Sequence, residues 1–389
     1  MEFPPKKKAG IYIHIPFCAK KCPYCDFYSI TDLSLTSGFA NVLLQEMGAN
    51  RLDTLFFDTL YIGGGTPSIL DGNQIYRILE GAFRYFKVMP GAELTMEINP
   101  GTVNLSQLRE YRQAGINRIN IGIQSFQDPN LDFLGRIHCA RDANLSFDWA
   151  IQAGFANIGI DLIYGLPRQT KTNWLKDLEH AVRLQPTHLS CYMLTCEPGT
   201  PLHQDMLRGK VKAADDGNIR QLFDFTAEYL EFHEYIQYEV SNFARSDEAG
   251  SEANRSRHNM KYWSLAPYIG FGPSAHSFLE PKRYWNYADV KKYIHEIEAG
   301  RPAVEETELL TSEQIMMEAV YLQLRTAAGI DLAGFNQKFD LDFVQTFDKI
   351  IAGLEKDALL KLSRSHCALT RKGLAFLDTI VPMFTSQKI

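Results

Sequence analysis

Short β-branched and aliphatic runs alternate with longer amphipathic stretches between residue 10 and about residue 245. This alternation is typical of repeated βα units, in which helices cover a sheet of parallel strands. The amphipathic stretches carry apolar residues at helical spacing, and several end at Gly or Pro. We predict strands at 10–16, 59–65, 93–99, 118–125, 157–165, 188–194 and 237–242. The expected fold is therefore α/β, with a partial parallel (β/α) barrel over residues 1–245.

The pattern changes twice after residue 245. Residues 246–304 are rich in Gly, Pro and polar side chains, so we expect an irregular connecting region with a functional role. Residues 305–389 combine helical patterns with two short strand-like runs, LLKL and CALT, which predicts a small C-terminal helical module with a two-stranded wing. Winged modules often bind nucleic acid, but this one is no richer in Lys and Arg than its surroundings. We expect it to be a structural cap.

Charge and hydropathy limit the partners and the location. The net charge of -6 gives no overall attraction to polyanions, so we expect no nucleic-acid partner. The longest apolar runs are far shorter than the ~20 residues that span a bilayer, and we expect no transmembrane segment. MEFPPKKKAG leads directly into a predicted strand rather than into an apolar signal segment. These observations predict a cytoplasmic protein, and they leave both a monomer and a homodimer open.

Three of the seven cysteines lie within eight positions, in the motif FCAKKCPYCDF. Cys18, Cys22 and Cys25 directly follow the first predicted strand, where parallel barrels place their active sites. Thiolates at this spacing favour an iron-sulfur cluster or zinc, but a zinc site would need a fourth ligand nearby, and the next cysteine is Cys139. We predict a [4Fe-4S] cluster with three protein ligands and one open iron. The remaining cysteines are expected to be small buried apolar side chains: Cys139, Cys191, Cys196 and Cys367.

With this cysteine loop the chain resembles the radical S-adenosylmethionine superfamily. The resemblance implies that S-adenosylmethionine binds the open iron, and that electron transfer from the cluster yields a 5'-deoxyadenosyl radical. Each polar residue at a strand end could equally cap a helix or pair with an arginine, but together they predict one ligand pocket. By resemblance, the S-adenosylmethionine pocket comprises Tyr12, Tyr24, Gly64, Gly65, Thr66, Glu97, Gln124, Arg136 and Asp161.

Further motifs narrow the resemblance to the oxygen-independent coproporphyrinogen III dehydrogenases and the related heme chaperones, HemW. The dehydrogenase pattern has a fourth cysteine where this chain has Phe27, and it has a longer segment than the seventeen residues that precede Cys18. The run HNMKYW matches the HNxxYW motif of the heme chaperones. The resemblance implies a protein that binds heme and delivers it to acceptor proteins. In that interpretation His258 is the axial ligand, and the porphyrin contacts are Asn259, Tyr262 and Trp263.

Alternatives to the carrier remain. One is an enzyme that decarboxylates coproporphyrinogen III with a deoxyadenosyl radical, and no catalytic residue can be assigned for it. A second is a radical protein that acts on RNA through the winged module, which the charge balance disfavours. A third concerns the site alone: a histidine beside Tyr and Trp often has only a hydrogen-bonded surface or hinge role.

Overall fold

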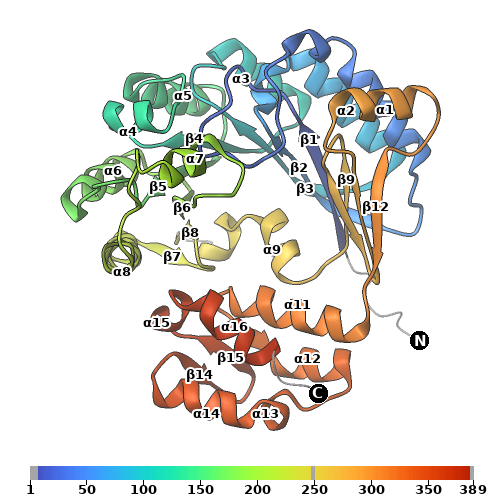
Figure 1. Ribbon diagram of the computed structural model, residues 1–389. Coiled ribbons are helices and arrows are strands. Elements are labelled where there is room, and N and C mark those ends of the chain that lie inside the picture. Colours follow the sequence, from blue (N-terminus) through green and yellow to red (C-terminus); the bar gives the residue numbers. More distant parts are fainter. Residues whose placement is uncertain (1–7, 247–249, 386–389) are drawn as a thin grey trace.

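The computed structural model describes residues 8–246 and 250–385, which form a large sheet covered by helices and a smaller C-terminal module (Figure 1). The large sheet has twelve strands in the order β12-β11-β10-β9-β1-β2-β3-β4-β5-β6-β8-β7. In this order β12 and β7 are the two edges, so the barrel is open on one side. Six strands pair in parallel in chain order, and β9 also lies parallel to the first of them. The six strands are β1 (Lys8–Ile15), β2 (Phe56–Gly64), β3 (Lys87–Ile98), β4 (Arg118–Gln124), β5 (Asn157–Tyr164) and β6 (His188–Met193). The predicted partial parallel (β/α) barrel is confirmed.

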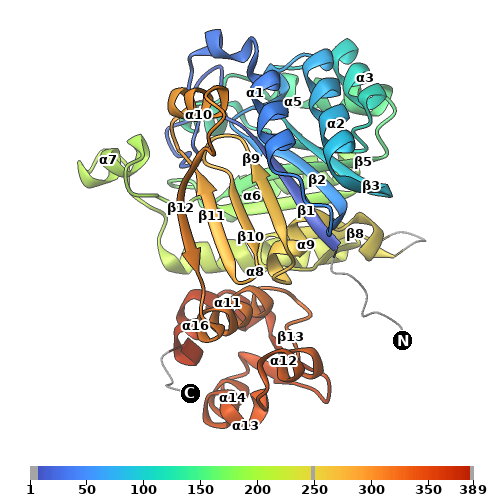
Figure 2. The ribbon, with the colours of Figure 1, turned by 90° about the vertical axis from the view of Figure 1, so that its right-hand side faces the viewer.

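Helices cover the outer face of these strands (Figures 1 and 2). Most begin at a side chain that accepts a hydrogen bond from the first helical turn. Asp71 and Gln74 form a capping box on α2, Asn104 caps α3, and Thr170 caps α6. The helices of this part of the chain are α1 (Phe39–Ala49), α2 (Gly72–Tyr85), α3 (Leu105–Ala114), α4 (Asp128–Phe133), α5 (Ala140–Gln152), α6 (Lys171–Leu184), α7 (Pro201–Leu207) and α8 (Asp216–Phe232).

Strand β1 shows how the sheet separates the core from the site. Ile11, Ile13 and Ile15 are fully buried and belong to the hydrophobic core that also contains residues of α1 and α2. Tyr12 and His14 alternate with them, and successive side chains of a strand point to opposite faces. Tyr12 stacks on Tyr61 of β2, so the even-numbered positions of β1 line the barrel interior.

The sheet continues beyond residue 245, where we expected the barrel to end. Residues 246–304 contain a helix, three strands and a second helix rather than irregular chain. Short antiparallel strands with polar residues on one face give little hydrophobic signal, so the pattern missed them. Residues 238–241 form the turn of a hairpin, so the strand predicted at 237–242 is wrong. The hairpin strands are β7 (Tyr235–Gln237) and β8 (Asn242–Arg245). The elements beyond residue 245 are α9 (Arg257–Trp263), β9 (Tyr268–Phe271), β10 (His276–Leu279), β11 (Lys282–Asn286), α10 (Val290–Glu298) and β12 (Val304–Leu309).

The C-terminal module lies below the barrel in Figure 1 and has its own three-stranded sheet. The predicted wing is present as the antiparallel pair β14 and β15, to which β13 adds a third strand. No helix within the described residues is both long and apolar enough to cross a membrane. The elements of the module are α11 (Ser312–Leu324), β13 (Ile330–Asp331), α12 (Leu332–Phe339), α13 (Phe343–Thr346), α14 (Asp348–Lys356), β14 (Leu360–Leu362), β15 (His366–Leu369), α15 (Arg371–Leu374) and α16 (Leu377–Thr385).

Candidate functional site

The cysteine loop leaves the carboxyl end of β1 and is anchored to the neighbouring strand. The amide of Gly65 donates to the carbonyl of Ile15 (2.8 Å), and the amide of Thr66 donates to that of Phe17 (2.7 Å). The Thr66 hydroxyl lies 3.4 Å from the sulfur of Cys18. A Cβ at position 65 would come within 2.8 Å of the Phe17 carbonyl, so the close approach of β2 to this loop requires glycine.

Arg136 connects the cysteine loop to the ends of β3 and β4. Its Nη1 lies 3.6 Å from the sulfur of Cys22, and its Nη2 donates to the Asn99 side chain (2.7 Å) and to the carbonyl of Gly122 (2.8 Å). The Asn99 amide in turn donates to the Thr66 hydroxyl (2.9 Å). The Nε of Arg136 is buried and has no partner among the described residues, so one donor remains for a ligand.

The donor set of the loop fits an iron-sulfur cluster. Burial raises the pKa of the Cys25 thiol, and the neighbouring thiols of Cys22 and Cys18 raise it further, so the three sulfurs interact. Within the described residues no three His, Cys, Asp or Glu side chains converge on a single metal ion. A cubane cluster does not require this, because each of its cysteines binds a different iron. Three soft thiolates and a nearby guanidinium suit such a cluster.

The other cysteines are less uniform than expected. Cys191 and Cys367 are buried, as predicted, and Cys196 is half-buried. Cys139 is exposed, because it lies at the start of α5, where its amide donates to Asp142 (3.1 Å).

Two half-buried carboxyl groups lie deeper in the barrel. Glu97 accepts a hydrogen bond from the Tyr61 hydroxyl (2.7 Å), and Asp161 accepts one from the Asn120 side chain (2.9 Å). Burial raises the pKa of Glu97 to about 7 and the pKa of Asp161 to about 6, and the proximity of Asp161 contributes to the shift of Glu97. A cationic ligand would relieve both shifts.

Gly64, Gly122 and Gln124 lie where the backbone is left-handed or closely packed. Gly64 has a φ of 111°, and a Cβ there would meet the His14 ring at 2.8 Å. Gln124 has a φ of 69° at an irregularity in the pairing of β4 with β5. A Cβ on Gly122 would lie 3.1 Å from the side-chain nitrogen of Gln124.

The two predicted tyrosines occupy different places. Tyr24 is in the cysteine loop, where Arg136 hydrogen-bonds it and Leu134, Ile163 and Leu166 pack against it. Tyr12 lies in the barrel interior. Nε2 of His14 donates to the carbonyl of Tyr28 (2.8 Å), so Nδ1 of the neutral ring is the acceptor, and the Tyr12 hydroxyl donates to it (3.0 Å). The resemblance had grouped them around one ligand, whereas here Tyr24 is the closer to the cluster loop.

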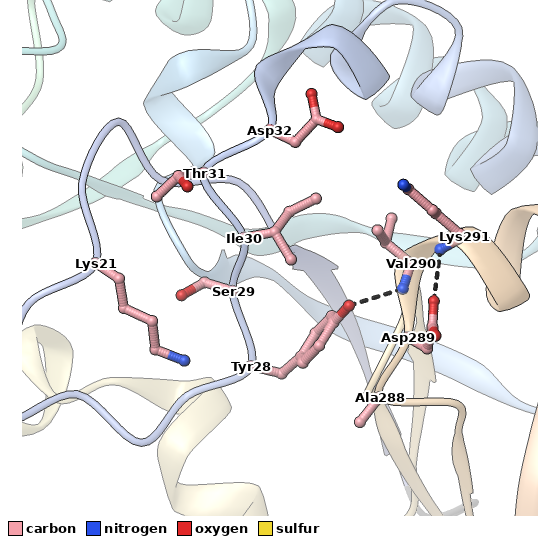
Figure 3. Close-up of a pocket in the computed structure, with 10 residues that line it drawn as sticks. All are labelled: Lys21, Tyr28, Ser29, Ile30, Thr31, Asp32, Ala288, Asp289, Val290 and Lys291. Carbon is pink, nitrogen blue, oxygen red and sulfur yellow. Dashed lines mark hydrogen bonds between the residues drawn. The ribbon is translucent and has the colours of Figure 1, made fainter. Parts of the chain in front are cut away.

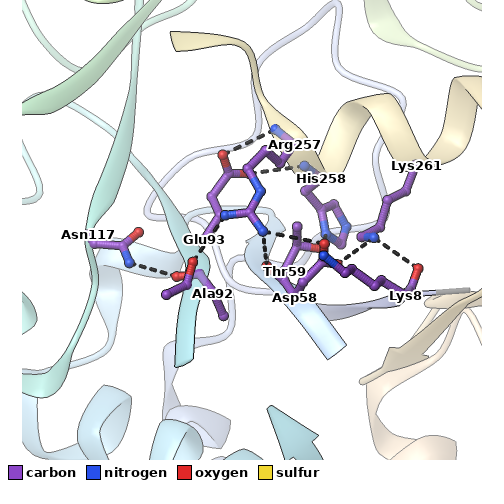
Figure 4. Close-up of polar contacts among 10 residues, drawn as sticks. Lys8, Asp58, Thr59, Ala92, Glu93, Asn117, Arg257, His258 and Lys261 are labelled. Carbon is purple, nitrogen blue, oxygen red and sulfur yellow. Dashed lines mark hydrogen bonds and ion pairs between the residues drawn. The ribbon is translucent and has the colours of Figure 1, made fainter. Parts of the chain in front are cut away.

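The HNMKYW motif forms α9, at the amino-terminal ends of the strands and away from the cysteine loop (Figures 1 and 4). The expectation of an irregular loop is therefore wrong. The carboxylate of Glu93 accepts from the amides of Arg257 (3.1 Å) and His258 (3.0 Å), and Lys261 forms an ion pair with Asp58 (2.5 Å). The helix thereby covers the base of the barrel.

His258 is 1% exposed, and both of its ring nitrogens are engaged. Nδ1 shares a hydrogen bond with the Thr59 hydroxyl and Nε2 with the Tyr262 hydroxyl, each at 2.9 Å. Burial lowers the pKa of His258 to about 3, so the ring is neutral. In this conformation neither nitrogen is free to bind iron.

The other residues of the motif also lie on this helix. Tyr262 packs edge-on against Tyr268, with ring centroids 4.8 Å apart. The guanidinium carbon of Arg325 lies over the indole of Trp263, 4.3 Å from the centroid of that ring. The Nε1 of Trp263 is buried and has no partner among the described residues. Asn259 is half-buried, and its amide donates to the hydroxyl of Ser256 (3.3 Å).

The sequence interpretation missed several residues of this interior. Two of them, His14 and Asn99, could have been found from their two-residue spacing from Tyr12 and Glu97, since alternate positions of a strand share a face. The missed residues are His14, Thr59, Tyr61, Glu93, Asn99 and Asn120.

The chain matches known proteins along its whole length. The Radical SAM superfamily profile matches residues 12–181, and the HemN C-terminal domain profile matches residues 310–376. Over 386 residues, 97% of this chain and 99% of that protein, the sequence is 36% identical to "Heme chaperone HemW" of Bacillus subtilis (strain 168). The chain belongs to the HemW family.

Other HemW proteins and a solved structure agree with this membership. The "Heme chaperone HemW" of Escherichia coli (strain K12) is 37% identical over 271 residues, 69% of each chain. The structure of coproporphyrinogen III oxidase (HemN) from Escherichia coli, described as a radical SAM enzyme, has a TM-score of 0.84 and 24% identity, and covers 98% of this chain and 91% of that one. At this identity the likeness to HemN concerns the fold.

Proposed function

We propose that this chain is a heme chaperone, which binds heme and passes it to acceptor proteins. The observation that carries this proposal is the full-length similarity to HemW proteins described as heme chaperones. The acceptor is any protein that takes up the delivered heme.

We further propose that Cys18, Cys22 and Cys25 hold a [4Fe-4S] cluster that binds S-adenosylmethionine. Such a cluster supplies one electron to cleave the bound S-adenosylmethionine. The Gly64–Thr66 segment lets the ligand approach the backbone closely. Arg136 orients the cluster side of the site, and its unpartnered Nε can donate to a carboxylate. Glu97 and Asp161 provide the negative charge that a sulfonium or ammonium group needs.

The protein acts as a carrier rather than as a coproporphyrinogen dehydrogenase. Phe27, which stands where the dehydrogenase pattern has its fourth cysteine, is 68% exposed on the cysteine loop. It offers no thiolate to the site. We also place the protein in the cytoplasm, because free cysteines persist in a reducing compartment.

Anaerobic reconstitution tests carrier against catalyst. Protein loaded with iron and sulfide is given heme in one series and coproporphyrinogen III with S-adenosylmethionine in another. A carrier binds stoichiometric heme, releases it to an apo heme protein and forms no protoporphyrinogen IX. Turnover of coproporphyrinogen at about one per second or faster, the lower end of ordinary enzyme rates, would establish the dehydrogenase instead.

A further inference from the structure

A row of residues on the inner face of the sheet runs from the barrel interior onto the antiparallel strands. Tyr12 of β1 is opposite Gly270 of β9, and the pairing of β9 with β10 brings Gly270 beside His276. His276 in turn is opposite Trp285 of β11. Residues directly opposite in neighbouring strands project from the same face. His276 and Trp285 therefore share the face of Tyr12, on strands that lie toward the β12 edge of the sheet (Figure 2).

His276 differs from His14 and His258 in being available. His14 and His258 are buried, and both ring nitrogens of each are hydrogen-bonded. His276 is exposed, and within the described residues nothing hydrogen-bonds its ring. Partial desolvation against the sheet and then the charge of Arg283 lower its pKa, so the imidazole is neutral near neutral pH, which is the form that binds a metal.

Trp285 fixes the orientation of this imidazole. The two rings are stacked, with centroids 5.3 Å apart and planes at 23°. An imidazole that binds heme iron stands roughly perpendicular to the porphyrin. A stacked indole limits its rotation, so Trp285 can act as a positioning residue that lies edge-on to the macrocycle.

A cavity of about 520 Å³ lies between the cysteine loop and the start of α10 (Figure 3). Lys21 lines one side and Lys291 the other, and neither forms an ion pair with another described residue. Each acidic residue of the cavity also caps a helix, since Asp32 accepts from the amide of Ser34 (3.1 Å) and Asp289 accepts from that of Lys291 (2.9 Å). Ala288, in the cavity wall, is three residues after Trp285, at most about 11 Å along the chain.

We propose that His276 is an axial ligand of heme, and that the heme propionates point toward Lys21 and Lys291. Heme then binds on the open side of the barrel, near the cysteine loop, and α9 remains closed over the base. This inference rests on the proposed heme-binding function. It gives the iron a neutral nitrogen donor and gives the carboxylates two ammonium groups that form no ion pair within the described residues.

Heme titration of the cluster-loaded protein tests the ligand. The oxidised [4Fe-4S] cluster is diamagnetic, so electron paramagnetic resonance reports the ferric heme alone. The wild type should show a nitrogen-ligated heme. His276→Ala should lose that signature, bind heme at least ten-fold more weakly, and recover the signature when imidazole is added. Trp285→Ala should weaken binding while it retains the nitrogen ligand.

Matched variants decide between His276 and the rest of the surface. His295→Ala removes another exposed histidine, on α10, and should change nothing. Lys291→Gln should weaken binding several-fold without a change of ligand, whereas Lys292→Gln at the next position should not. If His276→Ala bound heme with unchanged affinity and spectrum, or if the nitrogen signature vanished only in a folded His258→Asn variant, the assignment would be overturned. If the wild type bound no heme, the proposed function itself would fail.

Discussion

At the scale of single residues, the barrel interior holds polar groups that burial makes sensitive to their partners. Tyr61 and Asn120 bond to the carboxyl groups of Glu97 and Asp161, and Arg136 reaches the cysteine loop. The first two contacts are single hydrogen bonds between neighbouring strands, and the third joins the loop after α4 to the cysteine loop. Changes of one side chain therefore test the site directly.

The cysteine triad should be the sole source of cluster ligands. Replacing Cys18, Cys22 or Cys25 with Ser should abolish the brown chromophore and the bound iron and sulfide, because a hard alkoxide is a poor substitute for a soft thiolate. Changes at Cys139, Cys191, Cys196 and Cys367 are the controls and should leave the iron content unaltered. Loss of iron in one of these controls, with retention in a triad variant, would show the cluster to lie elsewhere.

Glu97 should make stability depend on pH. Its pKa rises from 4.5 to about 7 on folding, so between these values the folded state binds more protons than the unfolded state. The contribution of Glu97 to the free energy of unfolding therefore falls as pH increases through this window, by up to about 3 kcal/mol. The stability of the wild type relative to Glu97→Gln should fall from pH 5 to pH 8, as measured by urea unfolding of the apoprotein.

The comparison with the variant is needed because buried histidines act in the opposite direction. His258 stays neutral in the fold, with its pKa lowered to about 3, so it favours folding as pH rises. That contribution is common to both proteins and cancels. Glu305→Gln, at an exposed position of β12, provides the control. If the difference in free energy of unfolding between the wild type and Glu97→Gln changed with pH no more steeply than the difference for Glu305→Gln, the raised pKa of Glu97 would be refuted.

At the scale of elements, α9 is a short helix held by residues distant in sequence. Glu93 binds its first amides, Thr59 holds the imidazole of His258, and Asp58 pairs with Lys261. A carboxylate at a helix N-terminus also interacts favourably with the helix dipole. A seven-residue helix gains little from its own propensity, so these contacts stabilise it.

We expect His258→Ala to destabilise the fold by about 2 to 4 kcal/mol. The change leaves the hydroxyls of Thr59 and Tyr262 without a partner and creates a cavity. Asn259→Ala, the adjacent residue of the motif, should cost much less because its side chain makes no hydrogen bond within the described residues. Chemical denaturation of both variants measures this, and equal costs would contradict a packing role specific to His258.

The elements divide into those that sequence pattern could predict and those it could not. The parallel strands were predictable because helices cover them and they appear as continuous apolar runs. Strand β12 was not, because five of its six residues are exposed. The burial of His258 was invisible for another reason: Glu93 and Thr59 lie 165 and 199 residues away in sequence.

The candidate site was predictable to a similar extent. The cysteine loop and the polar strand ends are local signals. The role of Asn99 is visible only in the folded structure, where its side chain hydrogen-bonds to Thr66 and Arg136. Register between strands, which no single segment encodes, decides which polar residues face each other. The position of His276, exposed and stacked on Trp285, likewise follows only from that register.

At the scale of the whole molecule, the C-terminal module and the barrel meet around Arg325. Its Nε donates to the carboxylate of Glu239 (2.8 Å), a residue with no exposed surface, and its guanidinium lies over Trp263 of α9. Two backbone hydrogen bonds flank this contact, from Val240 to the Arg325 carbonyl (3.2 Å) and from Ala327 to the Tyr238 carbonyl (3.0 Å). The same arginine thus touches the module, the β7–β8 hairpin and the heme-chaperone motif.

Arg325 should therefore control how firmly the module is attached. Arg325→Met leaves a buried carboxylate without its cation, and breaking a buried pair from one side typically costs about 3 to 5 kcal/mol. Limited proteolysis should then cut between the barrel and the module sooner than in the wild type, while the cysteine loop still binds its cluster. The double variant Glu239→Gln with Arg325→Met should regain part of the stability, because no unpaired charge remains. Arg301→Ala, which removes an exposed ion pair with Glu296, should leave the proteolysis pattern unchanged. If Arg325→Met resisted protease as well as the wild type, the backbone contacts alone would be sufficient to join the two parts.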